Sequence, residues 1–507
     1  MTVSGDVFSE MPTIPEFYKG KTVLITGGTG FVGKLLVEKL LYSCPDVKRI
    51  YLVIRHKKEV CPEKRLAEIY KNSCFERLRR ERSGLFQSKV KAVSGNLLDP
   101  NLGLSEEDRV LVTTTTDILI HSAASVRFDD SLKYAFDVNV VATLQLLELA
   151  KKMSNLKCYV HISTSFCNIK LGAAIEEKIY PPRADWRTIR EICDNGDFHT
   201  INTLTPKLLG EYPNTYVFTK HLAEQAVSEH RGELPIIIVR PSVVTGCLEE
   251  PAPGWVDNFN GPMGICVAGA QGVLRSVYGD PKSSQDYVPG DVAIKGILMA
   301  SWLRGTKPLQ AHDDIPVYHA CAGAEHLISM EYIRDVGLEA APIIAFENTF
   351  RPMNVVFFNS LLLFRLYVLM SHVLPAVAAD VVFRVLGKKP MLLRLQRRVI
   401  GANLALEFFM KQSLIFNNDK FMELLTKLDP QDRKQFSFTL DGLKSTEYVV
   451  NGGLRARKDL LHQDEKTLKK WRTIYKWEVI VDRVITLTLY ACALWWILRR
   501  AVTSYAM

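Results

Sequence analysis

Short apolar runs alternate with helical stretches along the first half of the chain. Runs typical of buried strands occupy residues 23–25, 50–54, 90–93, 118–120, 159–162 and 236–239. Among the intervening segments, residues 138–153 and 218–230 place apolar side chains at helical spacing. This alternation predicts an α/β fold built on a doubly wound parallel sheet of the Rossmann type.

Three segments do not follow this alternation of predicted strands and helices. Residues 168–212 carry many charges, which predicts an inserted loop or a helical pair beside the site. Residues 247–290 are rich in Gly and Pro, which is typical of substrate-binding loops with short helices. From about residue 351 the pattern is helical and apolar, so we expect a second, mainly helical domain.

Composition narrows the class of protein. The 507 residues are 47% hydrophobic and 23% charged, which excludes a disordered chain and a coiled coil. None of the ten cysteines forms a C-x-x-C pair, so we expect no metal site and a reducing compartment.

The charge is unevenly distributed. Residues 351–507 hold 25 Lys and Arg against 13 Asp and Glu, whereas residues 1–350 are nearly neutral. A basic, apolar-rich back half favours contact with an anionic surface, and solvated charges on a helical domain are the alternative. No nucleic-acid recognition motif accompanies these charges, so we expect no nucleic-acid partner.

A glycine-rich turn follows the first predicted strand and opens a helix. Gly27 suits a turn with positive φ, Gly30 lets the backbone approach a pyrophosphate, and Gly33 allows close helix packing. The helix N-terminus offers free N–H groups to phosphates. The turn therefore predicts dinucleotide binding by Thr26, Gly27, Gly28, Thr29, Gly30, Phe31, Val32 and Gly33.

Cations follow the second predicted strand, where an NAD site usually carries an acidic residue. Arg55, Lys57 and Lys58 suit a ribose 2′-phosphate, which favours NADPH, and a solvated basic turn is the alternative. Asp99 follows the third strand, at a position where its side chain can meet the adenine. The small residues after His121 would let the cofactor lie against the backbone.

Tyr216 and Lys220 are spaced i, i+4, so they share one face of a predicted helix. We expect the ammonium, together with a bound cofactor's positive ring, to lower the phenol's pKa toward neutrality. The phenol then donates a proton to a carbonyl oxygen that receives hydride. We expect Thr164 to hold the same oxygen, with Ser163 or Ser165 as alternatives.

These motifs resemble the extended short-chain dehydrogenase/reductase superfamily. More narrowly, the chain is similar to the fatty acyl-coenzyme A reductases from about residue 20 to 500, in stretches such as TGGTGFVGKLLVEKLL, HISTSFCN and NTYVFTKHLAE and in its basic helical back half. The glycine turn and Tyr-x-x-x-Lys specify only the superfamily. The longer stretches and the C-terminal region carry the narrower resemblance.

The resemblance implies reduction of a long-chain fatty acyl-CoA to a primary alcohol with two NADPH, through an aldehyde-level intermediate. Thr164 and Tyr216 would hold the developing oxyanion, and Lys220 would orient the ribose. No acyl-enzyme cysteine is implied, and we interpret Cys167 as a small buried residue. The alternatives are a superfamily dehydrogenase or epimerase acting on a sterol or nucleotide sugar, and a cofactor-binding scaffold without activity.

The last apolar run, residues 484–498, predicts a membrane anchor. As a helix it reaches ~22 Å, and residues 479–483 extend it toward the ~30 Å hydrocarbon core. A buried C-terminal helix is the alternative. Residues 355–386 carry Arg365, His372, Asp380 and Arg384, so we expect a segment lying on the surface or forming an acyl tunnel.

The expected organisation has four parts: an N-terminal tail (1–19), an NADPH-binding reductase domain (20–350), a helical domain (351–477) and an anchor helix (478–500). We expect the catalytic domain to face the cytosol. The endoplasmic reticulum is the default membrane for a tail-anchored lipid enzyme, and the peroxisome is the alternative, although TSYAM is not a Ser-Lys-Leu address.

Overall fold

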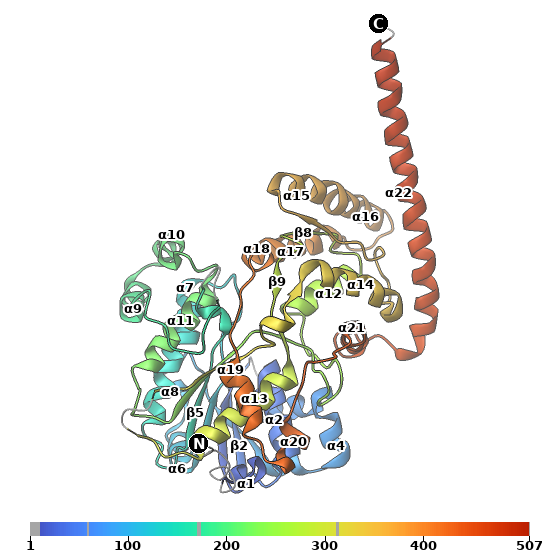
Figure 1. The fold of residues 1–507 in the computed structure, drawn as a ribbon. Helices are drawn as coiled ribbons and strands as arrows, with labels where there is room; N and C mark the ends of the chain where they lie inside the picture. Colours follow the sequence, from blue (N-terminus) through green and yellow to red (C-terminus); the bar gives the residue numbers. More distant parts are fainter. Residues whose placement is uncertain (1–10, 58–59, 170–173, 311–313, 506–507) are drawn as a thin grey trace, which may run out of the picture. The chain divides into compact units, whose positions relative to one another are not determined.

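The computed structural model describes residues 11–57, 60–169, 174–310 and 314–505 (Figure 1). Contacts divide the chain into two compact units. Unit 1 comprises Met1–Trp255, Ser284–Ile328 and Gln412–Gly442, and unit 2 comprises Val256–Ser283, Ser329–Lys411 and Leu443–Met507. Each unit is thus assembled from three separate segments, and the linear domain boundaries expected from the sequence remain predictions.

Unit 1 is built on a seven-stranded parallel sheet with the order β11-β6-β5-β4-β1-β2-β3. The apolar runs correctly predict six of these strands. Only β11 was not expected, because its sequence VYHA contains a histidine and no long apolar run. The strands are β1 (Thr22–Thr26), β2 (Arg49–Ile54), β3 (Val90–Ser94), β4 (Ile118–His121), β5 (Cys158–Ile162), β6 (Ile236–Pro241) and β11 (Val317–Ala320).

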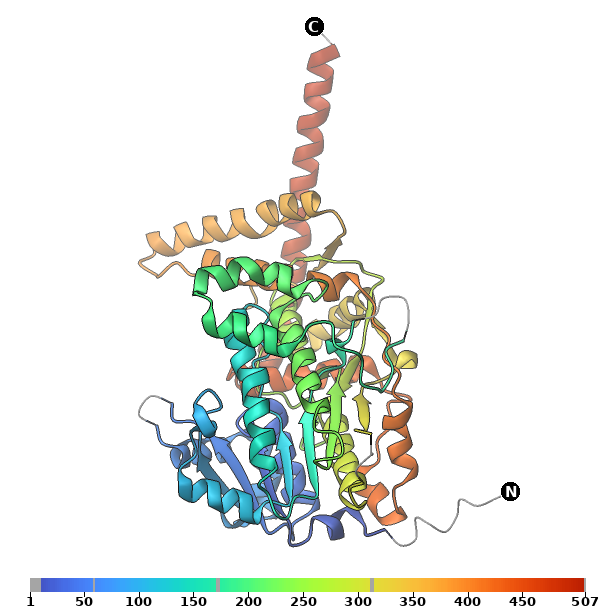
Figure 2. The same cartoon turned by 90° about the vertical axis from the view of Figure 1, so that its left-hand side faces the viewer.

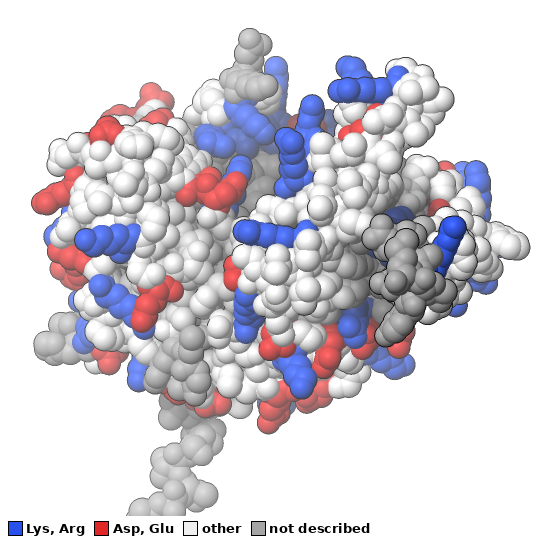
Figure 3. Space-filling model, turned by 90° about the horizontal axis from the view of Figure 1, so that it is seen from above, with Lys and Arg blue, Asp and Glu red and all other residues white. Residues whose placement is uncertain are grey.

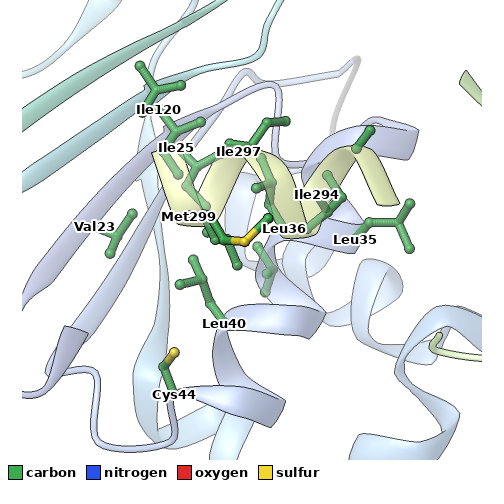
Figure 4. Close-up of a cluster of buried hydrophobic side chains, with 14 of the residues drawn as sticks. Val23, Ile25, Leu35, Leu36, Leu40, Cys44, Ile120, Ile294, Ile297 and Met299 are labelled. Atoms are coloured by element: carbon green, nitrogen blue, oxygen red, sulfur yellow. The ribbon is translucent and has the colours of Figure 1, made fainter. Parts of the chain in front are cut away.

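Helices cover both faces of this sheet. Because strand side chains alternate between faces, Val23 and Ile25 pack with α2 (Phe31–Ser43) and α13 (Gly290–Gly305), whereas Leu24 packs on the opposite side. Figure 4 shows the first cluster, in which the β1 side chains meet Leu36 of α2 and Ile297 of α13. Each large apolar side chain buried in this way contributes about 1.5–3 kcal/mol to folding.

The opposite face is covered by helices that include α6 (Glu106–Thr115), α8 (Ala142–Ala150) and α11 (Thr215–Ser228). The charged insertion forms a helical pair, α9 (Trp186–Asn195) and α10 (Phe198–Leu209), which is one of the two alternatives expected from the sequence. The other elements of unit 1 include α1 (Ile14–Tyr18), α3 (Pro62–Lys71), α4 (Glu76–Glu81), α5 (Leu85–Lys89), α7 (Leu132–Phe136), the π-helical turn η3 (Asp137–Val141), the 3-10 turn η4 (Ser165–Cys167), β7 (Val243–Thr245) and β10 (Tyr287–Pro289).

One late segment belongs to unit 1. The helices α19 (Asp419–Thr426) and α20 (Pro430–Phe436) bury Phe421 and Phe436 in the core on the α13 side of the sheet. The carboxylate of Glu177 accepts hydrogen bonds from the backbone N–H groups of Lys420 (2.6 Å) and Phe421 (3.1 Å) at the start of α19. Burial and this capping contact explain why the segment packs with the front half of the chain.

Unit 2 is mainly helical. Its elements include α12 (Pro262–Ala270), β8 (Ser276–Tyr278), α14 (Met330–Ile344), β13 (Val356–Phe358), α15 (Leu361–Val368), the π-helical turn η6 (Leu369–Val373), α16 (Leu374–Val385), α17 (Leu392–Ala405), α18 (Glu407–Lys411), α21 (Ser445–Arg455), the π-helical turn η7 (Ala456–Leu460) and α22 (Leu468–Tyr505). The elements α15, η6 and α16 form one continuous rod, shown across the upper part of Figure 2. Among the described residues, this rod, Leu361–Val385, is the one helix long and apolar enough to cross a bilayer.

Candidate active site

The glycine turn joins β1 to α2 at the carboxyl end of the sheet. Gly27 has a φ of 73°, the left-handed conformation that the turn was expected to need, and its carbonyl accepts the N–H of Gly30 at 2.9 Å. A Cβ on Gly27 would lie only 2.7 Å from the backbone nitrogen of Ala123. A Cβ on Gly30 would meet only the Gly27 carbonyl, at 3.3 Å, so the backbone remains approachable there. The turn is therefore tightly packed against Ala123 at Gly27 and open at Gly30, at the N-terminus of α2.

The remaining residues of the turn play different parts. A Cβ on Gly28 would lie 2.8 Å from a leucine side chain of β2, and a Cβ on Gly33 would collide with the Gly27 carbonyl. The Phe31 ring stacks on Trp255 at 5.3 Å between centroids. Thr29 and Val32 are partly exposed. Phe31 thus uses its ring for packing within unit 1, and its backbone N–H is the group it offers at the helix N-terminus.

The end of β1 is tied to the end of β4 by a buried polar contact. The Thr26 hydroxyl lies 2.7 Å from Nδ1 of His121, whose Nε2 lies 3.0 Å from the Thr143 hydroxyl. Burial, reinforced by the charge of Lys220, lowers the pKa of His121 to about 3, so this imidazole is neutral. The contact fixes the two strand ends where the sheet order changes direction, which is where doubly wound sheets bind ligands.

The cations expected near a ribose phosphate lie after β2. Arg55 and Lys57 are exposed, whereas Lys58 lies outside the described residues. The Arg55 carbonyl accepts a hydrogen bond from the guanidinium of Arg65 on α3. Arg65 therefore adds a second guanidinium close to Arg55, a neighbour that the sequence did not reveal.

Asp99 is held within its own loop. Its Oδ1 accepts a hydrogen bond from the Asn96 side chain at 2.9 Å, and the residue is exposed. The loop is closed by the bond from the Asn96 N–H to the Leu102 carbonyl, at 2.7 Å. The structure thus presents Asp99 at the carboxyl end of β3, where the sequence analysis expected it.

Tyr216 lies in the first turn of α11. Its ring stacks against Phe128 with centroids 6.1 Å apart, and the Thr164 side chain is close enough to lower the pKa of its phenol. The two flanking hydroxyls point elsewhere, since Ser165 donates to the Pro241 carbonyl at 3.2 Å and Ser163 lies 3.8 Å from the sulfur of Cys167. Of the three candidates, the structure thus brings Thr164 to the phenol.

Lys220 follows one turn later and is almost fully buried, with 1% of its surface exposed. Its Nζ donates a hydrogen bond to the Ile162 carbonyl at 2.7 Å and lies 3.5 Å from Nε2 of His161. Burial lowers the pKa of Lys220 to about 8, opposed mainly by the negative charge of Glu224. The ammonium is thereby fixed at the end of β5, on the strand that leads to Thr164.

In the chain without cofactor, the Tyr216 pKa shifts upward, whereas the lowered pKa expected from the sequence includes the charge of a bound cofactor and stays a prediction. Burial raises the pKa of Tyr216 to about 12, and the Thr164 side chain only partly opposes this change. Removing a phenolate from water is more costly than removing a neutral phenol, which explains the direction. Tyr216 is consequently protonated at neutral pH.

A buried ion pair joins α11 to β6 one helical turn after Lys220. The Arg240 guanidinium on β6 donates to both carboxylate oxygens of Glu224 on α11, at 2.9 and 2.7 Å. Cys167 is fully buried, and its sulfur lies 3.2 Å from Glu224. Burial raises the pKa of the Cys167 thiol well above its usual range, so the thiol stays protonated. This agrees with the interpretation of Cys167 as a small buried residue.

Two family models match the chain. One, an NAD-binding model described as male sterility protein, covers residues 25–297, and the other, named Sterile and described in the same words, covers residues 371–463. Fatty acyl-CoA reductase 1 of Xenopus laevis is 39% identical over 474 residues, 92% of this chain and 90% of that protein. The Homo sapiens protein of the same name is 37% identical over 476 residues, with the same shares covered.

The chain belongs to the fatty acyl-CoA reductase family.

Solved structures agree on the fold. The terminal R domain of the myxalamid PKS-NRPS pathway has a TM-score of 0.56 and 18% identity, covering 91% of this chain and 95% of that one. The reductase domain of a nonribosomal peptide synthetase from Mycobacterium tuberculosis has a TM-score of 0.56 and 19% identity, covering 91% and 96%. The Rossmann-type fold expected from the sequence is confirmed.

The glycine turn of this family member fits a nicotinamide cofactor. The backbone at Gly30 is open to a pyrophosphate, and the N-terminus of α2 carries partial positive charge. Together with the NAD-binding family model, this geometry identifies a nicotinamide dinucleotide as the cofactor class.

Sequence reasoning missed several residues that shape the site. Asn139 is buried, accepts the Ser125 N–H at 2.8 Å and donates to the Thr219 hydroxyl on α11 at 2.9 Å. A lone Asn within the apolar stretch VNVVATL was an available signal. For Arg240 and Glu224 no local signal existed, because the contact joins a strand to a helix 16 residues away.

Proposed function

We propose that the protein reduces long-chain fatty acyl-CoA to a primary fatty alcohol with two NADPH, through an aldehyde-level intermediate. The observation that carries the proposal is that Tyr216 interacts with the Thr164 side chain, with the buried Lys220 one helical turn later, in the unit that holds the glycine turn. The relatives named fatty acyl-CoA reductase support the substrate class, since they span nearly the whole chain.

In this mechanism Tyr216 is the acid. Its pKa of about 12 keeps the hydroxyl protonated at neutral pH, ready to donate its proton to a carbonyl oxygen as charge develops there. The Thr164 hydroxyl donates a second hydrogen bond to the same oxygen. A reduced nicotinamide, when bound, supplies the hydride. Lys220 presents a fixed positive charge that favours the anionic form of Tyr216 after the transfer.

The overall reaction proceeds in two rounds. Hydride adds to the thioester carbon and the Tyr216 proton to its oxygen, which gives a hemithioacetal. Its carbon–sulfur bond then breaks, releasing CoA as a thiol and leaving an aldehyde. A second hydride and a second proton convert the aldehyde to the alcohol, with Tyr216 reprotonated from solvent between rounds.

We infer a preference for NADPH from the basic group after β2. Arg55 and Arg65 place two guanidinium groups at the strand end, where planar donors suit a phosphate. No acidic residue for a ribose 2′-hydroxyl occupies positions 55–57.

We also propose that α22 anchors the protein in a membrane, with the catalytic domain in the cytosol. Asp482 accepts hydrogen bonds from Arg351 at 3.0 and 3.1 Å, so the acidic residue before the apolar stretch 484–498 is already paired within unit 2. The endoplasmic reticulum is the membrane we expect, and the peroxisome is the alternative. Deleting residues 484–507 should abolish carbonate-resistant membrane attachment, and persistence of that attachment would contradict the anchor.

The activity test combines the purified protein with NADPH and acyl-CoAs of different chain lengths. We expect fatty alcohol to form, with two NADPH oxidised for each CoA thiol released. Formation of aldehyde with a single NADPH per thiol would contradict the two-step reaction. Absence of NADPH oxidation with every acyl-CoA would contradict the proposed function altogether.

A further inference from the structure

The rod α15–η6–α16 exposes large apolar side chains along its outer side. Six of them, at intervals of four or seven residues, are Leu362, Leu366, Met370, Leu374, Val381 and Val385. Their exposed fractions range from 48% for Leu374 to 81% for Val385. Exposed apolar surface on this scale marks a binding surface in a stable protein.

The side of the rod that faces the rest of unit 2 carries its polar groups. His372, only 2% exposed, lies 3.0 Å from the Ser276 hydroxyl and 2.8 Å from the side-chain oxygen of Gln396. Asp380 accepts the backbone N–H groups of Met391 and Leu392, each at 2.9 Å, at the start of α17. His372 and Asp380 are thus bound to neighbouring elements of unit 2, while many of the rod's large apolar side chains remain exposed.

The surroundings of the apolar surface are strongly basic. Residues 361–406 contain seven Lys and Arg and a single acidic residue, Asp380, whose carboxylate is used at α17. Arg384, Lys388 and Lys389 are exposed at the end of the rod. Figure 3 shows Lys and Arg side chains, and also Asp and Glu side chains, among uncharged areas of the molecule in the view from above. Apolar side chains bordered by cations are complementary to an anionic lipid surface.

The packing of α17 indicates whether the rod crosses the bilayer or lies in the plane of its interface. This helix packs along α16 and exposes Arg394, Arg397 and Arg398 to solvent. If the rod crossed a bilayer, α17 would be carried to the same depth and these guanidinium groups would enter the hydrocarbon, which is costly. A rod in the interface plane buries the apolar side chains and leaves the cations among the headgroups.

We propose that the rod Leu361–Val385 is a lipid-binding surface that lies in the plane of a membrane containing anionic phospholipids, without crossing it. The proposal depends neither on the reductase activity nor on the α22 anchor. A second copy of the chain and a protein partner are the other conceivable occupants of this surface, and the tests below separate them.

The first test determines on which side of the membrane the two ends of the rod lie. Full-length protein carrying Cys492→Ser, with Asn359→Cys or Lys388→Cys, is reconstituted into phosphatidylcholine–phosphatidylserine vesicles and treated with an impermeant maleimide. An in-plane rod leaves both cysteines equally reactive before detergent is added. Protection of one of them until detergent opens the vesicle would overturn the proposal.

The second test measures lipid contact directly. A fluorophore is attached at Leu366→Cys, and at Tyr332→Cys on α14 as the control, and nitroxide lipids are added to the vesicles. We expect strong quenching at position 366, weaker quenching when phosphatidylserine is omitted, and little quenching at position 332. Equal quenching at both positions, or quenching independent of phosphatidylserine, would overturn the proposal. If nitroxide lipids do not quench the label at position 366, the surface is covered by protein and not by lipid, and the proposal is also overturned.

Discussion

Glu224 and Arg240 form a buried ion pair, with the Arg240 Nη2 to Glu224 Oε2 distance at 2.7 Å. The guanidinium side chain is 0% exposed and the carboxylate side chain 4%. The pair joins α11 to β6 directly after the helical turn that holds Lys220. It therefore fixes the helix that carries Tyr216 and Lys220 against the sheet.

Replacing Glu224 should affect both stability and the pH profile. Glu224→Gln leaves the buried Arg240 charge without its counterion, which costs about 3–5 kcal/mol. It also removes the negative charge that raises the pKa of Lys220. We expect a lower melting temperature and an alkaline limb of the activity profile that moves to lower pH.

A surface pair at the C-terminal cap of α11 provides the control for Glu224→Gln. Glu229 binds Arg187 at 2.8 Å at an exposed position, so Glu229→Gln should cost no more than ~1 kcal/mol and leave the pH profile unchanged. An unchanged profile in Glu224→Gln, together with normal turnover, would refute the link between this pair and Lys220.

The same pair predicts how stability depends on acid. Burial by itself would raise the pKa of Glu224, but the charge and hydrogen bonds of Arg240, together with smaller contributions from Ser163 and Cys167, outweigh it and lower the value to about 2. Because an unfolded Glu titrates near pH ~4.3, this carboxylate stabilises the fold above that pH and loses its contribution as the pH falls toward 2. Urea unfolding between neutral and acidic pH should show this loss in the wild type and not in Glu224→Gln.

Removing the Tyr216 hydroxyl should abolish most turnover while preserving cofactor binding. Tyr216→Phe keeps the ring that stacks on Phe128 but loses the acid, so we expect a ~10²–10⁴-fold lower kcat. Tyr212→Phe is a matched control, because the buried Tyr212 hydroxyl has no hydrogen-bond partner among the residues that the structure describes. The affinity for NADPH, measured by fluorescence titration, should be nearly equal for both variants. An unaffected kcat in Tyr216→Phe would exclude the phenol as the acid.

Lys220 should be required for turnover and unfavourable for stability. Burial lowers its pKa to about 8, so the folded state binds this proton less tightly than the unfolded state does, and stability should increase as the pH rises from 8 toward 10.5. Lys220→Met removes the buried charge and should stabilise the fold by about 1–3 kcal/mol at neutral pH while turnover collapses. Lys157→Met, at an exposed site, should change neither quantity. Loss of stability in Lys220→Met would contradict this account.

The sheet was predictable because its signals are local. Val23–Ile25 and the glycines that follow lie within a few positions of one another, and the spacing of Tyr216 and Lys220 is itself a helical signal. Membership of α19 in unit 1 depends instead on Phe421 fitting against Gly296, a contact between distant segments. For the same reason the sequence did not reveal that burial raises the pKa of Tyr216 in the cofactor-free chain, since desolvation is set by packing that no local pattern records.

Cofactor selection should depend on the two guanidinium groups after β2. Arg65 donates to the Arg55 carbonyl, so Arg65→Ala removes one charge and also frees the Arg55 backbone, whereas Arg55→Asp reverses a charge at the expected 2′-phosphate position. We expect each change to reduce the ratio of kcat/KM for NADPH over NADH by about tenfold or more, because a charge-assisted hydrogen bond to phosphate contributes ~1.5–3 kcal/mol. Lys64→Ala, exposed on the same helix as Arg65, should leave the ratio unchanged. If the ratio of kcat/KM for NADPH over NADH equals the wild-type ratio in all three variants, the determinant of NADPH preference lies elsewhere in the chain.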